Sequence, residues 1–457
     1  AGCGYTPPPI QTAYNLAGLY AEGFTGSGQT IVILDWCGSS TIQNDANAFS
    51  AMFGLPLLGP SNFSIIYTPT VSACEASDAE INIDVEWAHA IAPGANIDLV
   101  VPPSASFQDV NEAEYYAVNY QLGNSVSGSY GSPEALTPAS ELDNENLISE
   151  IAAISGISTN FSSADDGDFT AFGLPATVSA PADSPWATAV GGVSLALNAD
   201  NSIAWQSGWG NNEVELASAG FIFDPPLDFG FIGGAGGGPS NCAVQDSKGN
   251  CLAGFPKPPF QKNLAGKYRQ VPDIAWLADP FTGAVIAISV PGQVPEQVWQ
   301  VWGGTSVACP MFSALWAIAN QEAGTPLGQA AQWVYTLPAG AVTDVVPVTS
   351  KSNVKASILE STGTKNFNPS QVLGGKPPAT PPKFVSALWD YPFIEDTPLV
   401  VSFGMDCSAL PSSDLDGTSC NSASALHTKI GWDNVTGMGT PNGKAFADAF
   451  KPAAAVK

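Results

Sequence analysis

A serine at the start of an apolar helix is the first residue in this chain with the setting for catalytic chemistry. Residues 303–310 read Gly-Gly-Thr-Ser-Val-Ala-Cys-Pro, so small residues precede Ser306 and an apolar run follows it. The hydroxyl and backbone N–H of such a serine lie at the positive end of a helix, where backbone donors can stabilise the oxyanion of acyl transfer. The alternative interpretation is a helix N-cap without a chemical role.

A nucleophilic serine needs a base, and the chain holds only two histidines, His89 and His427. One interpretation is a triad of Asp35, His89 and Ser306 that resembles the triad of the subtilisins, because Asp35 follows a strand-like apolar run. However, His89 lacks the His-Gly-Thr setting of such a base, and His427 falls in a late loop-like stretch. A carboxylate base is therefore the favoured interpretation.

Two acidic residues with helical spacing provide that carboxylate base. Glu80 and Asp84 are four residues apart and share one helix face, whereas His89 is nine residues past Glu80 and faces the other way. Adjacent carboxyls can share a proton, so that one stays ionised as a base while the other orients it. The alternative is an exposed acidic face, but the apolar residues around them favour burial (Ile81, Ile83, Val85 and Trp87).

A third polar cluster follows the apolar stretch that ends at Phe161. Asp165, Asp166 and Asp168 flank Gly167 there. This pattern is consistent with a cation site, with an ordinary turn, or with a protonated aspartate that donates a hydrogen bond to an oxyanion.

The charge balance excludes a nucleic-acid partner. The 457 residues include 41 acidic and only 14 basic side chains, for a formal net charge of −27, whereas phosphate binding needs clustered cations. The excess of acid is consistent with simple solubility. It also fits acid tolerance, because few positive charges remain once the carboxylates are protonated.

The chain has eight cysteines, and their spacing does not match that of metal ligands. This pattern favours disulfides and an oxidising compartment. The alternative is several buried free thiols. We expect Cys242–Cys251 and Cys407–Cys420 to close small loops, with Cys37–Cys74 as a further guess. No apolar run reaches the roughly 18 residues that a membrane span needs. These features predict a secreted chain.

Strand-like and helix-like runs alternate through the first three hundred residues. This order predicts an α/β fold with a mostly parallel central sheet flanked by helices. The expected strands are 30–34, 96–101, 187–193 and 283–290, and the expected helices are 78–91, 110–120, 140–155 and 306–323. The glycine-rich run 233–239 is expected to be a loop without a nucleotide site. Residues 350–428 are expected to be an insertion, with a linker or surface excursion at 374–383.

Together these motifs resemble the sedolisin family, the serine-carboxyl peptidases, over most of the chain. Glu80 and Asp84 match that family's Glu-Asp helix, Ser306 in GGTSVACP matches its nucleophile, and Asp165 in SSADDG matches its oxyanion aspartate, with Ala164 in place of the usual glycine. Further matching segments are 130–134, 182–192, 271–283 and 431–442. The resemblance implies a subtilisin-like fold and a single peptidase domain over residues 1–457. Asp35 and Tyr130 stand where relatives have Glu and Trp, and are expected to extend the hydrogen-bond chain behind Asp84.

The resemblance also implies one structural calcium ion. Asp344 and Asp433 would supply carboxylates, and Val345, Lys429 and Gly431 would supply carbonyl oxygens, as a hard cation prefers. Lys429 stands where the family usually has glycine. The alternative is an unliganded loop.

The function that this resemblance implies is that of a secreted, acid-active endopeptidase with a Ser306-Glu80-Asp84 triad and Asp165 in the oxyanion hole. Its partners would be protein or peptide substrates and a removed N-terminal propeptide, with no nucleic acid and no membrane. A monomer and an extracellular, acidic location are expected. The alternatives are the histidine-based triad and an inactive homologue with a binding role.

Overall fold

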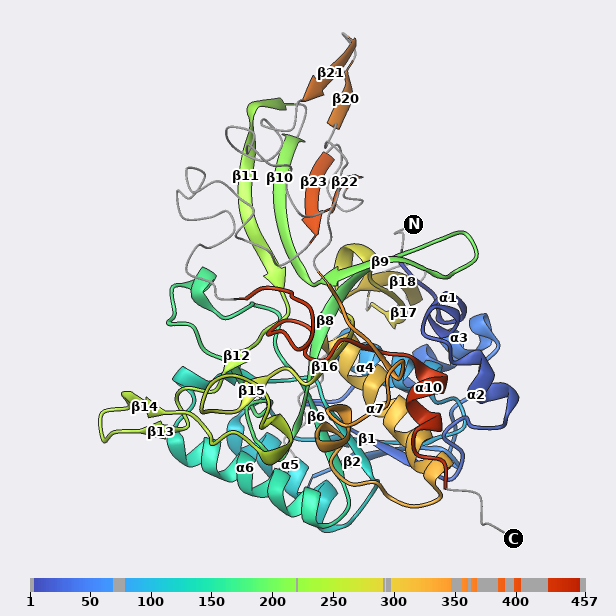
Figure 1. Ribbon diagram of the computed structural model, residues 1–457. Helices are drawn as coiled ribbons and strands as arrows, with labels where there is room; N and C mark the ends of the chain where they lie inside the picture. Colours follow the sequence, from blue (N-terminus) through green and yellow to red (C-terminus); the bar gives the residue numbers. More distant parts are fainter. Residues whose placement is uncertain are drawn as a thin grey trace.

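A computed structural model describes residues 4–68, 79–218, 221–290, 292, 297–346, 356–360, 363–367, 385–390, 398–403 and 426–452. Its core is a sheet in which seven strands run parallel, in the order β16-β8-β6-β4-β1-β3-β2, and β9 pairs antiparallel with β8 at one side (Figure 1). The strands of this sheet are β1 (Thr30–Leu34), β2 (Phe63–Tyr67), β3 (Asn96–Val101), β4 (Ser125–Gly128), β6 (Ser158–Ser162), β8 (Thr188–Leu197), β9 (Ile203–Gly208) and β16 (Ile274–Leu277).

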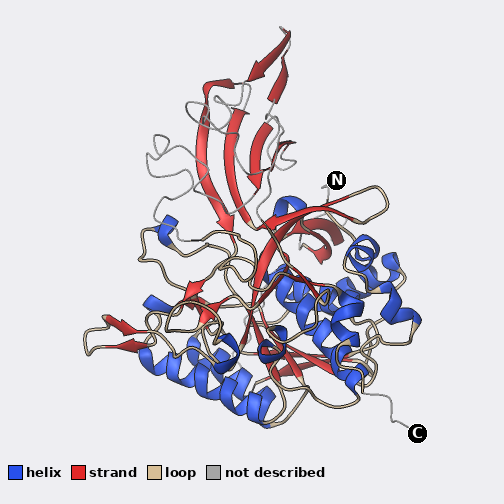
Figure 2. Cartoon of the chain, in the orientation of Figure 1, coloured by secondary structure: helices blue, strands red, loops and turns tan. Residues whose placement is uncertain are grey.

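Helices cover both faces of the sheet (Figure 2). The helices are α1 (Pro7–Ala13), α2 (Ala17–Ala21), α3 (Ile42–Phe53), α4 (Ala79–Ile91), α5 (Phe107–Asn119), α6 (Ala139–Ile154), α7 (Thr305–Ala323), α8 (Ala331–Val334) and α10 (Gly443–Asp448). No helix within the described ranges is both long and apolar enough to cross a bilayer.

The side chains of strand β1 belong to two hydrophobic cores, one on each face of the parallel sheet. Because successive side chains of a strand point to opposite faces, Ile31 and Ile33 join the cluster formed with α4 and α7. Val32 and Leu34 join the cluster formed with α5 and α6 on the other face. Because β1 is buried on both faces, its sequence is continuously apolar, and this apolar run is the pattern from which the strand was predicted.

The predicted fold class is confirmed. The expected strands 30–34 and 96–101 coincide with β1 and β3, and the four expected helices correspond to α4, α5, α6 and α7 within a few residues. The expected strand at 283–290 is present as β17 (Ala284–Ser289), but it forms an antiparallel hairpin with β18 (Gln297–Trp302) outside the parallel sheet.

A second sheet of four antiparallel strands, in the order β11-β10-β23-β22, projects from the body of the molecule (Figure 1). Its strands are β10 (Gly210–Ser218), β11 (Phe221–Gly234), β22 (Val385–Asp390) and β23 (Pro398–Phe403). The first two residues of the expected glycine-rich loop at 233–239 therefore belong to the end of β11. The expected insertion at 350–428 contributes β22 and β23 to this sheet, but most of it, with the expected linker at 374–383, lies outside the described residues.

The remaining strands form two-stranded pairs. These pairs are β5 (Ser132–Pro133) with β7 (Ser179–Ala180), β12 (Gly238–Pro239) with β15 (Gln270–Val271), β13 (Val244–Gln245) with β14 (Cys251–Ala253), β19 (Val342–Thr343) with β24 (Thr440–Pro441), and β20 (Ala356–Glu360) with β21 (Gly363–Phe367).

The expected disulfide between Cys242 and Cys251 is present and closes the β13–β14 hairpin. Cys37 is also disulfide-bonded. Cys309 is a buried free thiol, so at least one of the eight cysteines takes no part in a disulfide. Cys407 and Cys420 lie outside the described residues.

Candidate active site

Several candidate residues from the sequence analysis lie near the carboxyl ends of the parallel strands. Open α/β folds bind their ligands at this edge of the sheet. Asp35 follows β1, Ser129 follows β4, and Asp165 lies three residues beyond β6. Helix α7 begins at the same edge and carries Ser306 as its second residue.

Asp165 is fixed to the start of α7. Its Oδ1 accepts hydrogen bonds from the backbone N–H of Thr305 at 2.7 Å and from the Thr305 hydroxyl at 2.8 Å. Since the first N–H groups of a helix have no acceptor within the helix, the carboxyl serves as a cap supplied from another element. Ser306, the next residue along the chain, is thereby held beside Asp165.

Backbone conformation on both sides of this contact favours glycine. Gly304 has a φ of +103°, and a Cβ there would lie 2.6 Å from Oδ2 of Asp165, so only glycine lets the carboxyl approach the helix. Ala164 has a φ of +84°, a left-handed conformation that costs an L-residue about 1–2 kcal/mol. This strain accounts for the glycine that the family motif usually has at position 164.

Helix α4 brings the predicted acid pair to α7, against which it packs. Asp84 is fully buried and its Oδ1 accepts a hydrogen bond of 2.8 Å from the hydroxyl of Ser129. The same hydroxyl lies 3.3 Å from the backbone carbonyl oxygen of Ser306. Ser129 thus connects Asp84 to the main chain of the predicted nucleophile. Glu80 lies one turn before Asp84 and is half-buried.

Burial is the main cause of a raised pKa for Asp84, and the nearby carboxyls of Glu80 and Asp35 raise it further, while the Ser129 hydrogen bond lowers it. Asp84 and Glu80 therefore interact as an acid pair whose first deprotonation is easier than its second. Burial also raises the pKa of Asp165, against the opposing effect of the two Thr305 hydrogen bonds. Both shifts favour the neutral forms of these acids.

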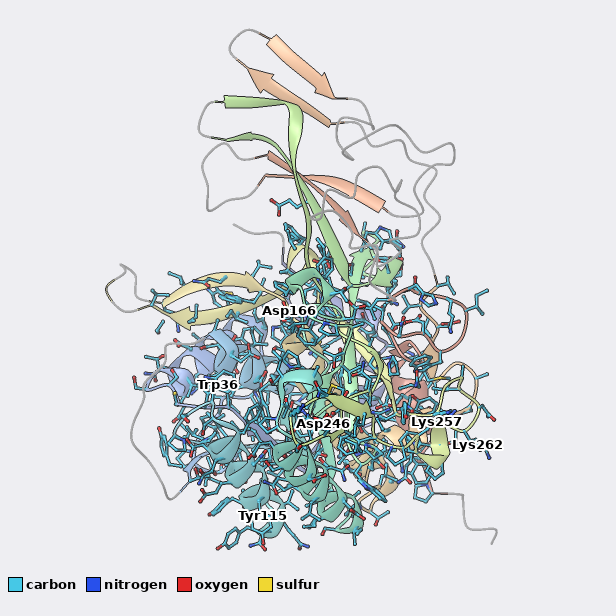
Figure 3. The ribbon with its side chains drawn as sticks, turned by 90° about the vertical axis from the view of Figure 1, so that its left-hand side faces the viewer. Trp36, Tyr115, Asp166, Asp246, Lys257 and Lys262 are labelled. Carbon is cyan, nitrogen blue, oxygen red and sulfur yellow. A yellow bond between two sulfur atoms is a disulfide. The ribbon has the colours of Figure 1, made fainter. Side chains whose placement is uncertain are left out.

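A cleft of about 660 Å³ opens beside Ser306. Figure 3 labels two residues that line it, Trp36 from the segment after β1 and Asp166 from the segment after β6. Ser306, Asp165 and Ser129 also line this cleft, whereas Glu80 and Asp84 are not among its described lining residues. The structure therefore brings the predicted nucleophile and oxyanion aspartate onto one wall, with the acid pair reached through Ser129.

The histidine-based alternative does not fit this geometry. His89 is buried with its Nε2 2.7 Å from the carbonyl oxygen of Pro56. Its Nδ1 makes no hydrogen bond within the described part of the chain, and burial lowers the pKa of the ring. Asp35 lies instead close enough to Asp84 to raise the pKa of that carboxyl. His427 is exposed in the loop that precedes α10.

The Tyr130 hydroxyl makes no hydrogen bond to any described residue, so the expectation that Tyr130 extends the hydrogen-bond chain behind Asp84 is wrong. Its ring packs edge-on against Phe161, and its pKa is raised by burial and then by the carboxyls of Glu114 and Glu145. Tyr130 therefore faces a different pair of acids from the one on α4.

The two segments expected to hold calcium lie together. The backbone N–H of Gly431 donates to Oδ2 of Asp344 at 2.8 Å, and Asp344 is exposed while Val345 is buried. Asp433 is buried and accepts four hydrogen bonds, two at each oxygen, from Lys429, Val435 and Thr436. A carboxylate has about four lone-pair positions, so Asp433 could ligate an ion only after releasing one of these donors, the weakest being Lys429 N–H at 3.3 Å.

Sequence reasoning missed Ser129 and Thr305. The position of Thr305 directly before the predicted nucleophile, at the start of the helix, could have indicated that its N–H and hydroxyl donate hydrogen bonds to a carboxyl. Ser129 directly precedes the predicted YGSPE segment, but no spacing rule indicates that its hydroxyl meets Asp84, forty-five residues away.

Two curated proteins resemble this chain in sequence. The chain is 29% identical over 358 residues to kumamolisin from Bacillus sp. (strain MN-32) and 27% identical over 354 residues to sedolisin from Pseudomonas sp. (strain 101), which in each case covers 73% of this chain. The matches cover 55% and 53% of these relatives, so the chain spans about half the length of the curated proteins it matches. No protein-family model matches the chain.

The fold has a solved counterpart. A structure of Pseudomonas sedolisin, described as a serine-carboxyl proteinase complexed with two molecules of pseudo-iodotyrostatin, superposes with a TM-score of 0.67 at 22% identity and covers 98% of both chains. With the two sequence relatives, this match confirms the resemblance to the sedolisin family and its subtilisin-like α/β fold.

Proposed function

From this sedolisin-like sequence and fold, we propose that the chain is a serine-carboxyl peptidase that hydrolyses proteins or peptides in acid. One observation carries the proposal: Ser306 and Asp165 lie together at the start of α7, and Ser129 ties the Ser306 main chain to the buried Asp84. Acyl transfer through a serine needs a nucleophile, a base that accepts its proton, and hydrogen-bond donors for the oxyanion. Ser306, the Glu80–Asp84 pair and Asp165 are groups of these three types.

The reaction proceeds in two transfers of the acyl group. Ser306 Oγ attacks the carbonyl carbon of the scissile bond, and its proton passes to Glu80. The C–N bond then breaks as Glu80 returns that proton to the leaving amine, which leaves an ester on Ser306. Water attacks this ester with Glu80 again accepting the proton, and Ser306 recovers it as the acid product leaves.

Asp84 and Asp165 support these steps without forming bonds to substrate carbon. Asp84 orients Glu80 and takes part in the shared titration of the pair. Asp165 is neutral in acid, and it donates its proton in a hydrogen bond to the tetrahedral oxyanion together with the N–H of Ser306. The raised pKa of Asp165 supports this role, because the carboxyl must stay protonated while Glu80 is partly ionised.

An acidic working range follows from the groups involved. At about pH 4 a histidine with a pKa near 6.5 is protonated and cannot act as a base, whereas a glutamate with a pKa near 4.3 is partly ionised. The disulfide between Cys242 and Cys251 supports a location outside the reducing cytoplasm. Release from a precursor and a monomeric state are further parts of the proposal that the resemblance suggests.

A single structural calcium ion completes the proposal. Asp344 and Asp433 would offer carboxylate oxygens, with main-chain oxygens from Val345, Lys429 and Gly431. An ion there would supply positive charge that joins the loop before α10 to the segment after β19. Its role would be to stabilise the fold, because none of these residues lines the cleft beside Ser306.

The test is cleavage of an unfolded protein substrate from pH 2 to 8 by the chain and by its Ser306→Ala variant. Cleavage with an optimum near pH 3 to 5 that disappears in Ser306→Ala, but persists in a Ser202→Ala control on the exposed β8–β9 turn, is the expected result. Fragments cut at internal bonds would establish an endopeptidase, whereas release of short N-terminal peptides alone would contradict that assignment. A folded chain without activity at any pH, with calcium supplied, would contradict the proposal and favour a binding role.

A further inference from the structure

Two buried carboxyls, those of Glu134 and Asp183, lie together behind one wall of the cleft and take no part in the proposed chemistry. Glu134 directly follows β5 and is fully buried, and Asp183 lies three residues after β7 and is 1% exposed. Their side chains hydrogen-bond to each other. Because an ionised carboxyl can only accept hydrogen bonds, this contact requires a proton on one of the two groups.

The other contacts of the pair place that proton on Asp183. One oxygen of Glu134 accepts a hydrogen bond of 2.6 Å from the hydroxyl of Ser240, and the other accepts one of 2.7 Å from the backbone N–H of Asn241. Donors at both oxygens stabilise the ionised form of Glu134. Oδ2 of Asp183, by contrast, is shielded from solvent and receives no hydrogen bond from any described residue.

The charges that face Asp183 also favour its neutral form. Burial is the largest cause of its raised pKa, followed by the carboxyls of Glu134 and of Glu145 on α6. Arg269 acts in the opposite direction, but its guanidinium is already in a buried ion pair with Asp273. Further titratable groups lie around Glu145 and Arg269, namely Glu114, Glu141, Tyr130 and Tyr335.

The pair joins two segments that form part of the cleft wall. Strands β5 and β7 pair over only two residues each, and three of these four residues line the cleft beside Ser306. A ladder this short provides few hydrogen bonds, so the contact between Glu134 and Asp183 is an important further link between the two segments. If both carboxyls were ionised, the link would become a repulsion between adjacent charges, which is strong where water is excluded.

We propose that Glu134 and Asp183 form a proton-dependent lock on this wall: their shared proton holds β5 against β7 in acid, and its loss to solvent at neutral pH separates the two strands and opens the cleft. The lock goes beyond the proposed function, because it makes the shape of the cleft depend on pH through residues outside the triad. The raised pKa of Asp183 gives the direction. The stabilisation is fully present below the unfolded pKa of about 3.9 and is lost as the pH rises through the folded value.

The experiment measures amide hydrogen exchange by mass spectrometry from pH 4 to 8, corrected for the intrinsic pH dependence of exchange. It uses the full-length Ser306→Ala variant, so that self-digestion does not interfere. Peptides that cover 130–136 and 177–183 should be protected in acid and lose protection as the pH rises, while β1 and β4 stay protected.

Variants of Asp183 test the shared proton. In Asp183→Asn the amide donates to Glu134 at every pH, so the midpoint of the loss should move up by about one pH unit or more. Asp183→Ser also carries a donor that does not ionise in this range, and it should raise the midpoint as well. Asp143→Asn, at an exposed acid on α6, should leave the midpoint unchanged.

Three results would overturn the lock. They are protection of β5 and β7 that persists to pH 8 without any Asp183 change, a midpoint that moves in neither Asp183 variant, and a loss of protection that occurs at the same pH in the whole chain, which would indicate global unfolding. None of these measurements requires cleavage, so the lock and the proposed peptidase activity can fail independently of each other.

Discussion

The hydroxyl of Ser129 donates a hydrogen bond of 2.8 Å to Oδ1 of the buried Asp84, and the same oxygen lies 3.3 Å from the main-chain carbonyl of Ser306. A serine hydroxyl carries one proton, so it cannot serve both acceptors in full. The shorter contact, to Asp84, receives that proton, and this hydrogen bond opposes the effect of burial on the pKa of Asp84.

Replacing Ser129 by alanine tests this connection. The hydrogen bond lowers the pKa of Asp84, so its loss should raise that pKa and move the acidic limb of the kcat/KM profile to higher pH. We expect kcat/KM at pH 4 to fall by about 10- to 100-fold. Ser129→Thr keeps a hydroxyl and should restore both the rate and the position of the limb. An unmoved limb in Ser129→Ala would show that Ser129 only packs against the helix.

Asp165 should act as a neutral hydrogen-bond donor. Asp165→Ala should lower kcat by about 10²- to 10³-fold, the usual cost of losing an oxyanion donor. Asp165→Asn keeps hydrogen-bond donors at this position, so its kcat should fall by less than that of Asp165→Ala. It should also lose the decline of activity at rising pH that ionisation of the aspartate causes. Asp166→Asn, one residue away, should cost less than tenfold, and an equal loss in both asparagine variants would contradict the special role of Asp165.

Calcium should stabilise the loop that precedes α10. Because Asp344 and Asp433 would hold the ion, adding millimolar calcium to chelator-treated protein should raise the melting temperature, and Asp344→Ala should abolish that rise. Thr343→Ala, at the neighbouring exposed position, should retain it. A melting temperature that does not respond to calcium would indicate that the four hydrogen bonds to Asp433 are its permanent partners.

Stability should be highest in acid. Burial raises the pKa of Glu145 to about 8 and that of Asp279 to about 6. An acid with a raised pKa in the folded state contributes stability that is fully present below its unfolded pKa and is lost as the pH rises through its folded pKa. For Asp279 the rise of about two pKa units corresponds to about 3 kcal/mol.

The melting temperature should therefore fall between about pH 4 and pH 8, a window set by the pKa values of these two acids. Asp279→Asn should flatten the dependence between pH 4 and 6. Ser194, Asn211 and Phe281 all donate hydrogen bonds to the Asp279 carboxyl, so the amide of the variant would face a donor and lower the overall stability. The comparison is therefore between the slopes of melting temperature against pH, not between the melting temperatures themselves. A melting temperature that rises with pH over this window would contradict the prediction.

The parts of the fold that the sequence predicted are those with local signals. Strands β1 and β3 are continuous apolar runs because both faces of the sheet are covered, and α4 combines apolar residues with the Glu80–Asp84 spacing. The four-stranded sheet was missed because β10 pairs with β23, almost two hundred residues later. Pairing over such a distance leaves no mark on local periodicity.

The same limit applies to the site. Ser306, Asp84 and Asp165 have motifs that can be read along the chain, whereas Ser129 acquires its role only when β4 and α4 meet. Glu145 is a further example, because it lies four residues after Glu141 and has the spacing of an exposed acidic helix face. Its burial against Tyr130 comes from the packing of α6 at the cleft, which no spacing rule encodes.

The most direct test of the account is the pH profile of kcat/KM for Glu80→Gln, measured from pH 2 to 8 beside the unmodified chain. Glu86→Gln is the matched control, since Glu86 lies on the same helix and accepts a hydrogen bond from Ala287 N–H that the amide oxygen can still accept. Loss of acid activity in Glu80→Gln, with activity retained in Glu86→Gln, is the predicted result. Acid activity that survives in Glu80→Gln would contradict the carboxylate-based triad.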